Sequence, residues 1–245
     1  MAGRARADGR IPELYSTLNA PNLESPAMPS STVEDYLKAI HRLAETGGDL
    51  VAVGKVATHL GLTPGTATTM MKHLEREGYV DYSPRKGVTL TERGHRAAKQ
   101  VLRRHRLIEL FLVEVMKLDW SEVHEEAEIL EHAFSDRLVE RIDEMLGRPA
   151  HDPHGDPIPD AEGVVAQDSD LRPLNGCGAG SYRLVRVARD EPEYLLWLQE
   201  RGLRPGVELA VKERDEVAGI STLTVGGGTD PVRVGEAAAA SLWVR

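Results

Sequence analysis

The chain has 245 residues, 41% of them hydrophobic, and a formal net charge of −9, which suits about two globular domains and argues against a protein that coats nucleic acid regardless of sequence. Its longest apolar runs fall far short of the ~18 residues of a membrane span, and residues 1–28 lack the continuous apolar core of a signal peptide, so we expect a cytoplasmic protein with no membrane partner. The single cysteine, Cys177, excludes an internal disulfide framework and any zinc site built from several cysteines.

The N-terminal residues 1–30 are rich in Ala, Arg, Gly, Pro and Ser and show no helical or strand periodicity. This composition predicts a disordered tail, in which Met28 is a second candidate for the start of the chain. Ser31 and Glu34 match the Ser-x-x-Glu capping box that opens many helices. Apolar residues then follow with helical spacing, and Gly47-Gly48 predicts the end of this first helix.

The next stretch has the layout of a winged helix-turn-helix. The expected elements are a helix over Val53–Leu60, a turn over 61–63, a helix over Pro64–Glu77, and strands over Tyr79–Tyr82 and Val88–Thr91. Gly61 permits the sharp turn, and Pro64 suits the first position of a helix. The hairpin between the two strands is the expected wing.

This stretch also has the chemistry of a DNA-binding surface. The candidate DNA-binding residues are Thr63, Thr66, Thr68, Thr69, Lys72 and His73 on the second helix and its turn, with Arg85 and Lys86 in the wing. Hydroxyls bond phosphates or base edges, and cations bind phosphates. Between Lys72 and Arg106, ten Lys or Arg stand against four Asp or Glu. None of the six candidates on the helix and its turn is Arg, Asn or Gln, so we expect modest base readout and a share of shape readout. The alternative is a helix-turn-helix used only for protein contacts.

Two further helices are predicted, over Glu92–Val115 and over Ser121–Leu146. Between Asp119 and Met145, ten Asp or Glu stand against two Lys or Arg. Such an acidic block is commonly a solvated helix face, but this one also contains two histidines. At ~100° per residue, Glu128, Glu131 and His132 fall on one stripe, with His124 one turn earlier, and His105 and Glu109 form an i, i+4 pair on the preceding helix.

These carboxylates and imidazoles indicate a metal site. The ordinary alternative for each Glu/His pair is a weak surface interaction. Carboxylate and imidazole ligands without thiolate favour a divalent first-row ion, so Mn²⁺ is the first candidate and Fe²⁺ the second, although the ligand types also suit zinc and copper.

The C-terminal part differs in character. His151–Gly180 is rich in Pro, Gly and Asp and predicts a linker. From Ser181 to Arg245, alternating apolar residues predict a small β-barrel with one helix near Glu191–Arg201. The expected organisation is a tail over 1–30, a DNA-binding domain over 31–95, a metal-binding and dimerisation domain over 96–150, a linker over 151–180 and a barrel over 181–245.

From about Ser31 to Arg245 the chain resembles the diphtheria toxin repressor family of metal-dependent transcriptional regulators. The shared stretches are Thr32–Leu37, the helix-turn-helix, His105–Glu109, His124–His132 and His154–Pro159. The resemblance implies an α+β fold made of an N-terminal winged helix-turn-helix, a helical dimerisation domain and a small C-terminal SH3-like β-barrel.

The resemblance also implies roles for the candidate ligands. It places Asp35, Glu128, Glu131 and His132 at the activating metal site, and His105, Glu109 and His124 at an ancillary one. The family's iron regulators have Met and Cys at the positions of Asp35 and Glu128, whereas its manganese-sensing members have carboxylates there, as this chain does.

The chain departs from the family pattern at two places. Lys38 stands where two-manganese members have a second carboxylate, which argues against a closely spaced pair of ions. The SH3-like domain of iron regulators lends carboxylate and amide ligands to the ancillary site, and Arg186 and Arg189 occupy those positions here. Asp190 or Glu191 are possible substitutes.

The resulting hypothesis is a homodimeric repressor that binds a palindromic operator in double-stranded DNA when Mn²⁺ is plentiful and controls metal uptake genes. One alternative is a metal-independent DNA-binding regulator whose acidic helix contacts a protein partner. A metallohydrolase is the third class, since carboxylates and histidines also hold catalytic ions, but no separate general base or nucleophile is evident, so we do not expect an enzyme.

Overall fold

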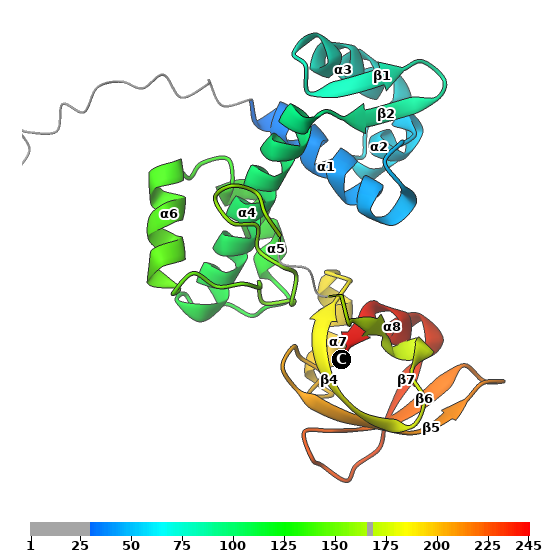
Figure 1. Ribbon diagram of the computed structural model, residues 1–245. Helices are drawn as coiled ribbons and strands as arrows, with labels where there is room; N and C mark the ends of the chain where they lie inside the picture. Colours follow the sequence, from blue (N-terminus) through cyan, green and yellow to red (C-terminus); the bar gives the residue numbers. More distant parts are fainter. Residues whose placement is uncertain (1–29, 166–168) are drawn as a thin grey trace, which may run out of the picture. The chain divides into compact units, whose positions relative to one another are not determined.

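A computed structural model describes residues 30–165 and 169–245. The predicted tail up to residue 29 and the alternative start at Met28 lie outside the described residues. Within the described part, the fold is α+β as predicted, with a winged helix-turn-helix, a helical block and a C-terminal antiparallel sheet (Figure 1).

The DNA-binding block contains three helices and a hairpin. These elements are α1 (Ser31–Gly47), α2 (Val53–His59), α3 (Pro64–Arg76), β1 (Val80–Ser83) and β2 (Gly87–Leu90). Gly61 has φ +65, the conformation that the turn between α2 and α3 needs. Buried Leu37, Ile40, Val56 and Met71 form its core, so α1 packs beneath the helix-turn-helix.

The wing is a tight antiparallel hairpin in which Val80 faces Leu90 and Ser83 faces Gly87. The Lys86 amide donates to the Ser83 carbonyl at 3.0 Å, closing the turn. A Cβ on Gly87 would lie 2.6 Å from the Val51 carbonyl oxygen. Only glycine at this position therefore allows Val51, in the segment before α2, to form its antiparallel bridge with Val88 of the hairpin.

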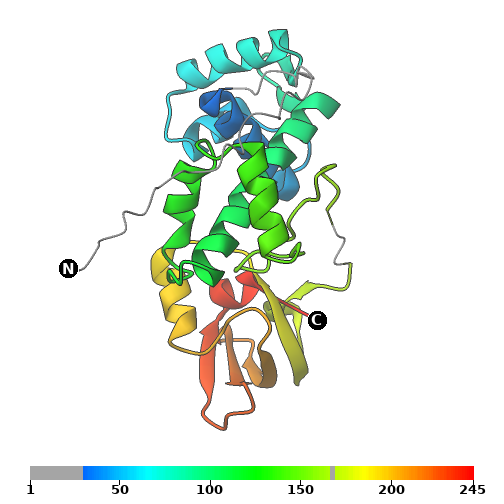
Figure 2. The same cartoon turned by 90° about the vertical axis from the view of Figure 1, so that its left-hand side faces the viewer.

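One long helix, α4 (Glu92–Glu114), continues from the wing into the helical block. The Thr91 hydroxyl caps it by accepting from the Gly94 amide. Helices α5 (Val123–Leu130) and α6 (Asp136–Met145) pack against α4 (Figure 2). Because α1 and α5 both contact α4, residues distant in the sequence meet along this helix.

Two sequence predictions are wrong in this region. The single helix expected over Ser121–Leu146 is interrupted after Leu130, because the Ser135 hydroxyl accepts from the Leu138 amide and starts α6 as a new helix. Ser31 is the first residue of α1 and not its cap, and the Glu34 carboxylate turns inward to Arg104 and His132 instead of closing a capping box.

The C-terminal block is a six-stranded antiparallel sheet with the order β3-β8-β4-β5-β6-β7, a barrel that is left open between β3 and β7. Its elements are β3 (Arg172–Pro173), the short 3₁₀ turn η1 (Leu174–Gly176), β4 (Gly180–Val187), α7 (Pro192–Gln199), β5 (Glu208–Asp215), β6 (Ile220–Val225), β7 (Val232–Gly235), α8 (Glu236–Ser241) and β8 (Leu242–Val244). Its core includes Leu184, Leu195 and Leu223, together with buried Cys177.

The sequence prediction for this block found the main strands and α7 but missed β3, α8 and β8. The expected linker over His151–Gly180 therefore contains regular structure, since β3 pairs with β8 through Pro173 and Trp243. In the described part of the chain, no helix has the length and apolar character needed to cross a membrane.

Candidate metal centre

The predicted ligands come from three helices and one turn. Asp35 and Lys38 lie one turn apart on α1, His105 and Glu109 lie on α4, and His124 and Glu128 lie on α5. Glu131 is the C-terminal cap of α5 and His132 lies in the turn after it. These two residues therefore do not extend the helical stripe that their spacing predicted. The turn instead directs them toward α1.

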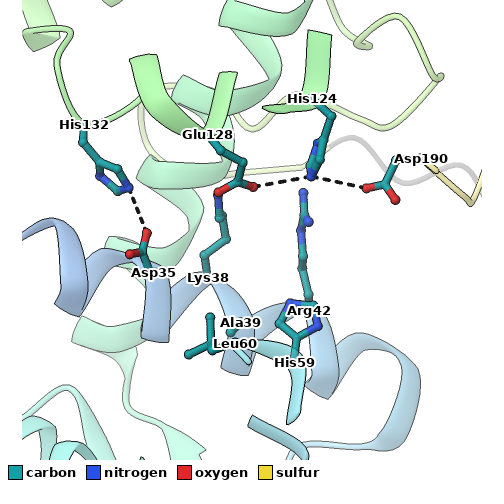
Figure 3. Close-up of a pocket in the computed structure, with 10 residues that line it drawn as sticks. All are labelled: Asp35, Lys38, Ala39, Arg42, His59, Leu60, His124, Glu128, His132 and Asp190. Atoms are coloured by element: carbon teal, nitrogen blue, oxygen red, sulfur yellow. Dashed lines mark hydrogen bonds and ion pairs between the residues drawn. The ribbon is translucent and has the colours of Figure 1, made fainter. Parts of the chain in front are cut away.

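At the junction of α1 and this turn, His132 contacts two carboxylates. Its Nε2 lies 2.8 Å from Asp35 Oδ1, and its Nδ1 lies 2.8 Å from Glu34 Oε2. Glu131 Oε1 is 3.5 Å from the same Nε2. Asp35, Glu131 and His132 thus offer ligand atoms within 4.8 Å of one another. Figure 3 shows Asp35 and His132 pointing toward each other on one side of a pocket. The volume of this pocket is about 540 Å³.

Glu128 and Glu131 both bind the ammonium group of Lys38. Lys38 Nζ lies 2.8 Å from Glu128 Oε2 and 2.6 Å from Glu131 Oε1. The other oxygen of Glu131 is 2.6 Å from His105 Nδ1, and the Glu131 side chain has no exposed surface. Glu128 therefore groups with His105 and Glu131, within 4.8 Å, rather than with Asp35 and His132.

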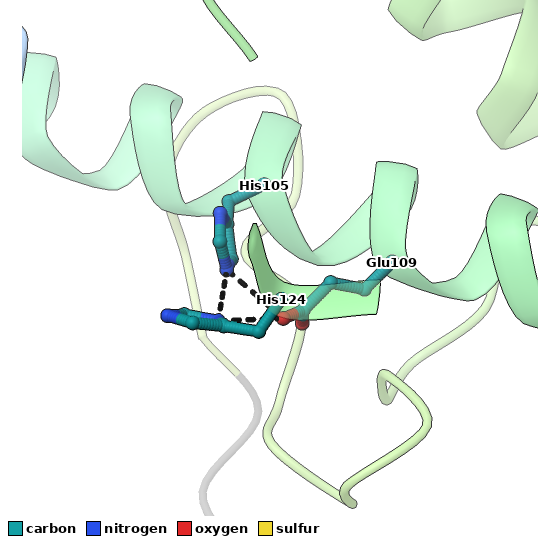
Figure 4. A group of neighbouring side chains, drawn as sticks. All are labelled: His105, Glu109 and His124. Atoms are coloured by element: carbon teal, nitrogen blue, oxygen red, sulfur yellow. Dashed lines mark hydrogen bonds and ion pairs between the residues drawn. The ribbon is translucent and has the colours of Figure 1, made fainter. Parts of the chain in front are cut away.

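A second group lies between α4 and α5 (Figure 4). Glu109 Oε1 is 3.0 Å from His105 Nε2 and 3.0 Å from His124 Nδ1, and the two imidazole nitrogens are 3.1 Å apart. His124 Nε2 also lies 3.7 Å from Asp190 Oδ2, which comes from the segment after β4. The three residues predicted for the ancillary site are therefore brought together.

Neighbouring charges and hydrogen bonds favour the charged forms of His105 and Glu128. Burial disfavours the charged form of His105, but attraction to Glu109 and hydrogen bonds to Glu109 and Glu131 outweigh it and raise the pKa of His105 to about 9. Burial likewise opposes ionisation of Glu128, but the Lys38 ammonium holds the pKa of that carboxyl below its usual value. A metal ion at His105 must therefore displace a proton.

Sequence reasoning missed several residues of the centre. Asp152 and buried His154 approach Glu109, and these three residues offer ligand atoms within 4.8 Å of one another. His154 belongs to a stretch that supported the family resemblance, but nothing in its spacing assigned it a role. Of the candidates after β4, Asp190 approaches His124, whereas Glu191 pairs with Arg189 and Arg186 pairs with Asp156.

The donor atoms fit a divalent first-row ion. Carboxylate oxygens and imidazole nitrogens make up the four candidate groups in the described residues, and none contains a thiolate. Ions of the Mn²⁺ and Fe²⁺ type accept this mixture. The histidines also have orienting carboxylates, as metal-bound imidazoles usually do.

The predicted DNA-binding residues lie on α3, the turn before it and the wing. Their side chains are exposed or half-buried: Thr63, Thr66, Thr68, Thr69, Lys72, His73, Arg85 and Lys86. The Thr63 hydroxyl caps α3, while the hydroxyls of Thr68 and Thr69 donate to carbonyls one turn earlier. Because those two protons are used within the helix, Thr68 and Thr69 have their methyl groups and hydroxyl lone pairs to offer DNA.

Comparisons with known proteins agree with this architecture. The family model described as "Iron dependent repressor, N-terminal DNA binding domain" matches residues 28–88, and "Iron dependent repressor, metal binding and dimerisation domain" matches residues 91–160. The iron-dependent repressor IdeR of Mycobacterium tuberculosis is 31% identical over 196 residues, 74% of this chain and 84% of the relative. The diphtheria toxin repressor of Corynebacterium efficiens is 31% identical over 193 residues, 74% of this chain and 82% of the relative.

Solved structures extend the likeness to nearly the whole chain. A manganese-dependent transcriptional repressor in complex with manganese is 40% identical, with a TM-score of 0.80, covering 87% of this chain and 99% of that one. The manganese regulator SloR is 33% identical, with a TM-score of 0.69, covering 89% of this chain and 98% of that one.

A winged helix-turn-helix joined to a metal-binding helical block defines a metal-dependent transcriptional repressor. The chain belongs to the diphtheria toxin repressor family. This family consists of DNA-binding regulators and not of enzymes, so the metallohydrolase alternative is set aside.

Proposed function

We propose that the chain is a manganese-responsive cytoplasmic repressor, with Fe²⁺ as the second candidate ion. In this proposal the metal-loaded homodimer binds a palindromic operator and controls genes of metal uptake and homeostasis. The carboxylate and imidazole donors support Mn²⁺, and several of the similar solved structures are named as manganese regulators, whereas the similar mycobacterial protein is named for iron.

The proposed ligands follow the two sets predicted from the sequence. Asp35, Glu131 and His132 hold the activating ion, with Glu128 as the fourth predicted ligand. His105, Glu109 and His124 form the ancillary set. The proposed domain limits stay at 31–95, 96–150, 151–180 and 181–245. The exposed apolar side chains Ile129, Leu138 and Met145 on α5 and α6 are candidates for the dimer interface.

One observation supports the mechanism most directly: Asp35 on α1 and His132 after α5 face each other at 2.8 Å. These carboxylate and imidazole groups would hold a divalent cation, whose coordination bonds would join α1 to the segment after α5. Because α1 forms the core beneath the helix-turn-helix, Asp35 then ties the position of α3 to the helical block. Two recognition helices must lie ~34 Å apart to enter successive major grooves. If the metal ligands come together only when the recognition helices have this spacing, metal binding raises the population of dimers with that spacing.

The direct test is an electrophoretic shift of operator DNA, titrated anaerobically with Mn²⁺, Fe²⁺ and Zn²⁺ and paired with metal analysis of the complex. We expect Mn²⁺ to restore binding that chelation abolishes. A shift that persists unchanged after exhaustive chelation would favour the metal-independent regulator, in which the acidic helix contacts a protein partner.

A substitution at Asp35 tests the activating site itself. Asp35→Asn keeps the shape of the side chain but removes the charge that a cation needs, so we expect the Mn²⁺ concentration for half-maximal operator binding to rise on the order of tenfold or more. Asp49→Asn, an exposed change just beyond the same helix, is the matched control. Equal Mn²⁺ responses of the two variants would refute the assignment.

A further inference from the structure

The C-terminal end of the recognition helix α3 is bonded to the beginning of α4. Gly78, at φ +73, follows the last turn of α3, and its amide donates to the Glu75 carbonyl at 3.0 Å. The Tyr79 amide donates to the Leu74 carbonyl at 2.9 Å, which completes a Schellman motif. This motif uses the carbonyls of Leu74 and Glu75 but not that of the cap residue, Glu77. The Glu77 carbonyl therefore needs a partner from another element.

Arg93, in the first turn of α4, supplies that partner. Its Nη1 donates to the Glu77 carbonyl, and its Nη2 donates to the Tyr79 hydroxyl at 3.1 Å. The guanidinium carbon also lies 4.2 Å from the centre of the Tyr79 ring, a cation–π contact. A positive charge at this position interacts favourably with the negative end of the α3 dipole. Arg93 thus holds both the end of α3 and the residue that leads into the wing.

The backbone at the start of α4 packs closely against the same turn. The Thr91 hydroxyl, which caps α4, lies 2.8 Å from the Gly78 carbonyl oxygen, and the Thr91 amide donates to the Tyr79 carbonyl at 3.0 Å. A Cβ on Gly94 would lie 2.0 Å from that Tyr79 oxygen, so only glycine allows this approach. The end of α3 and the start of α4 are therefore held in one arrangement.

This connection lies between the DNA-binding surface and the metal centre. From Arg93, α4 continues to His105 and Glu109, two of the proposed ligands. On its other side the connection holds α3, whose exposed residues include Thr69 and Lys72. A change in the direction of α4 relative to DNA is therefore passed on to α3.

Exposed arginines in a basic stretch commonly bind DNA phosphates. Arg93 is exposed and is one of the ten cations counted between Lys72 and Arg106. The structure favours a different role for it. Both terminal nitrogens of its guanidinium already bond protein oxygens, and one face of the group covers the Tyr79 ring. A bidentate bond to phosphate would require Arg93 to break these contacts.

We propose that Arg93 is a positioning residue for DNA recognition: it sets the angle between α3 and α4 and does not bind DNA phosphates. Because α3 reads bases only at an angle that admits it to the major groove, loss of Arg93 reduces sequence-specific binding. Non-specific binding depends on phosphate contacts of other cations and is unchanged. The inference uses the DNA-binding function of the family and, for metal loading, rests on the proposed function.

The test compares the full-length wild-type chain with Arg93→Gln and Arg93→Lys. One probe is a duplex selected from a random-sequence library by the Mn²⁺-loaded wild type, and the other is a scrambled duplex of the same length. Arg201→Gln is the matched control, because Arg201 lies 4.2 Å over the ring of Trp197 and donates to the Trp197 carbonyl at 2.8 Å, but in the C-terminal block. Binding is measured over a range of salt concentrations, and thermal unfolding verifies the fold.

We expect Arg93→Gln to bind the selected duplex about tenfold more weakly, a loss of the size expected for a charged hydrogen bond. It should bind the scrambled duplex as the wild type does, with an unaltered slope of log K against log salt on both probes. Arg93→Lys keeps the charge at the end of α3 but loses the planar fork and its stack, so its affinity for the selected duplex should lie between the other two. Arg201→Gln should match the wild type on both probes.

Equal weakening on both probes, with a slope shallower by about 1, would identify a phosphate contact and overturn the inference. Wild-type affinity of Arg93→Gln for the selected duplex would overturn it as well. If Arg93→Gln does not fold, Arg93→Lys decides in its place, and wild-type affinity of that variant for the selected duplex is the contrary result. A Mn²⁺-loaded wild type that selects no sequence contradicts the proposed function instead, and the salt slope of Arg93→Gln on the scrambled duplex then separates a phosphate contact from a positioning role.

Discussion

Glu34 is a buried carboxylate that acts through a neighbouring side chain. Its Oε2 lies 2.8 Å from His132 Nδ1 and 3.4 Å from the guanidinium of Arg104. A carboxylate that accepts the Nδ1 proton fixes the orientation of an imidazole, so Nε2 is the nitrogen that a metal ion on the Asp35 side would bind in place of a proton. We therefore expect Glu34 to position His132 rather than to bind the proposed ion itself.

Glu34→Gln tests this role. The amide oxygen can still accept a hydrogen bond, so we expect the fold to survive, but loss of the negative charge should weaken Mn²⁺ binding about tenfold. Isothermal titration calorimetry measures the affinity, and circular dichroism verifies the fold. Glu45→Gln, an exposed change on the same helix, serves as the control. An unchanged affinity in Glu34→Gln would mean that His132 is oriented without this carboxylate.

Among the elements, the contact between α1 and α4 contains two neighbouring histidines. His41 is buried, its Nδ1 has no hydrogen-bond partner among the described residues, and its ring centroid lies 5.7 Å from that of His95. Burial lowers the pKa of His41, and although Glu45 opposes this effect, the positive charges nearby add to it. The folded protein therefore resists protonation at this contact.

This contact should make the protein sensitive to acid. In the unfolded chain His41 titrates near its ordinary pKa of about 6.5. Because the folded pKa is lower, the stability present above pH ~6.5 is lost as the pH falls toward the folded value. We expect His41→Leu to flatten this decline in thermal unfolding between pH 7.5 and 5.5. The half-buried His73 provides the control, His73→Leu, and an equal decline in wild type and His41→Leu would contradict the argument.

The helices that the sequence predicted most accurately are those with strong periodicity and clear end signals. Helices α1 to α4 begin and end within one residue of the expected positions, because Gly47-Gly48 and Pro64 mark boundaries that neighbours do not alter. The break between α5 and α6 was missed because the apolar spacing continues through it. Strand β8 was missed because it has only three residues and follows an alanine-rich turn of helix.

The candidate site was predictable in part for a related reason. His105 and Glu109 share a face of one helix, so local geometry suffices to place them together. The meeting of Asp35 with His132, and of Lys38 with two glutamates, depends on how α1 packs against α4 and α5. Periodicity determines which face a residue occupies but not which face of another helix it meets. Asp35 therefore required the family resemblance, and the contacts of Glu34 and Asp152 required the structure.

At the scale of the whole molecule, the charge is strongly divided. The chain has a net charge of −9, yet the wing presents exposed Arg85 and Lys86 beside the exposed face of α3. The negative charge of the rest of the protein repels DNA. Contacts with DNA phosphates should therefore concentrate on this basic surface.

Salt dependence measures these contacts. Lys86→Ala should weaken operator and non-operator binding alike, and should make the slope of log K against log salt shallower by about 1, because one fewer counterion is released. Lys212→Ala, an exposed change on β5 of the C-terminal sheet, should leave the slope unaltered. If Lys86→Ala also leaves it unaltered, the wing does not contact phosphate.

The buried carboxylate of Glu131 has a consequence for dissecting the protein. The two family models meet between residues 88 and 91, which suggests a natural place to cut the chain. Yet Glu131 pairs with the ammonium of Lys38 on the far side of that cut as well as with His105 on the near side. A fragment starting at α4 would lose the first of these partners together with the packing of α1 against α4. The two halves are therefore best produced as one polypeptide, and they should unfold in a single cooperative transition.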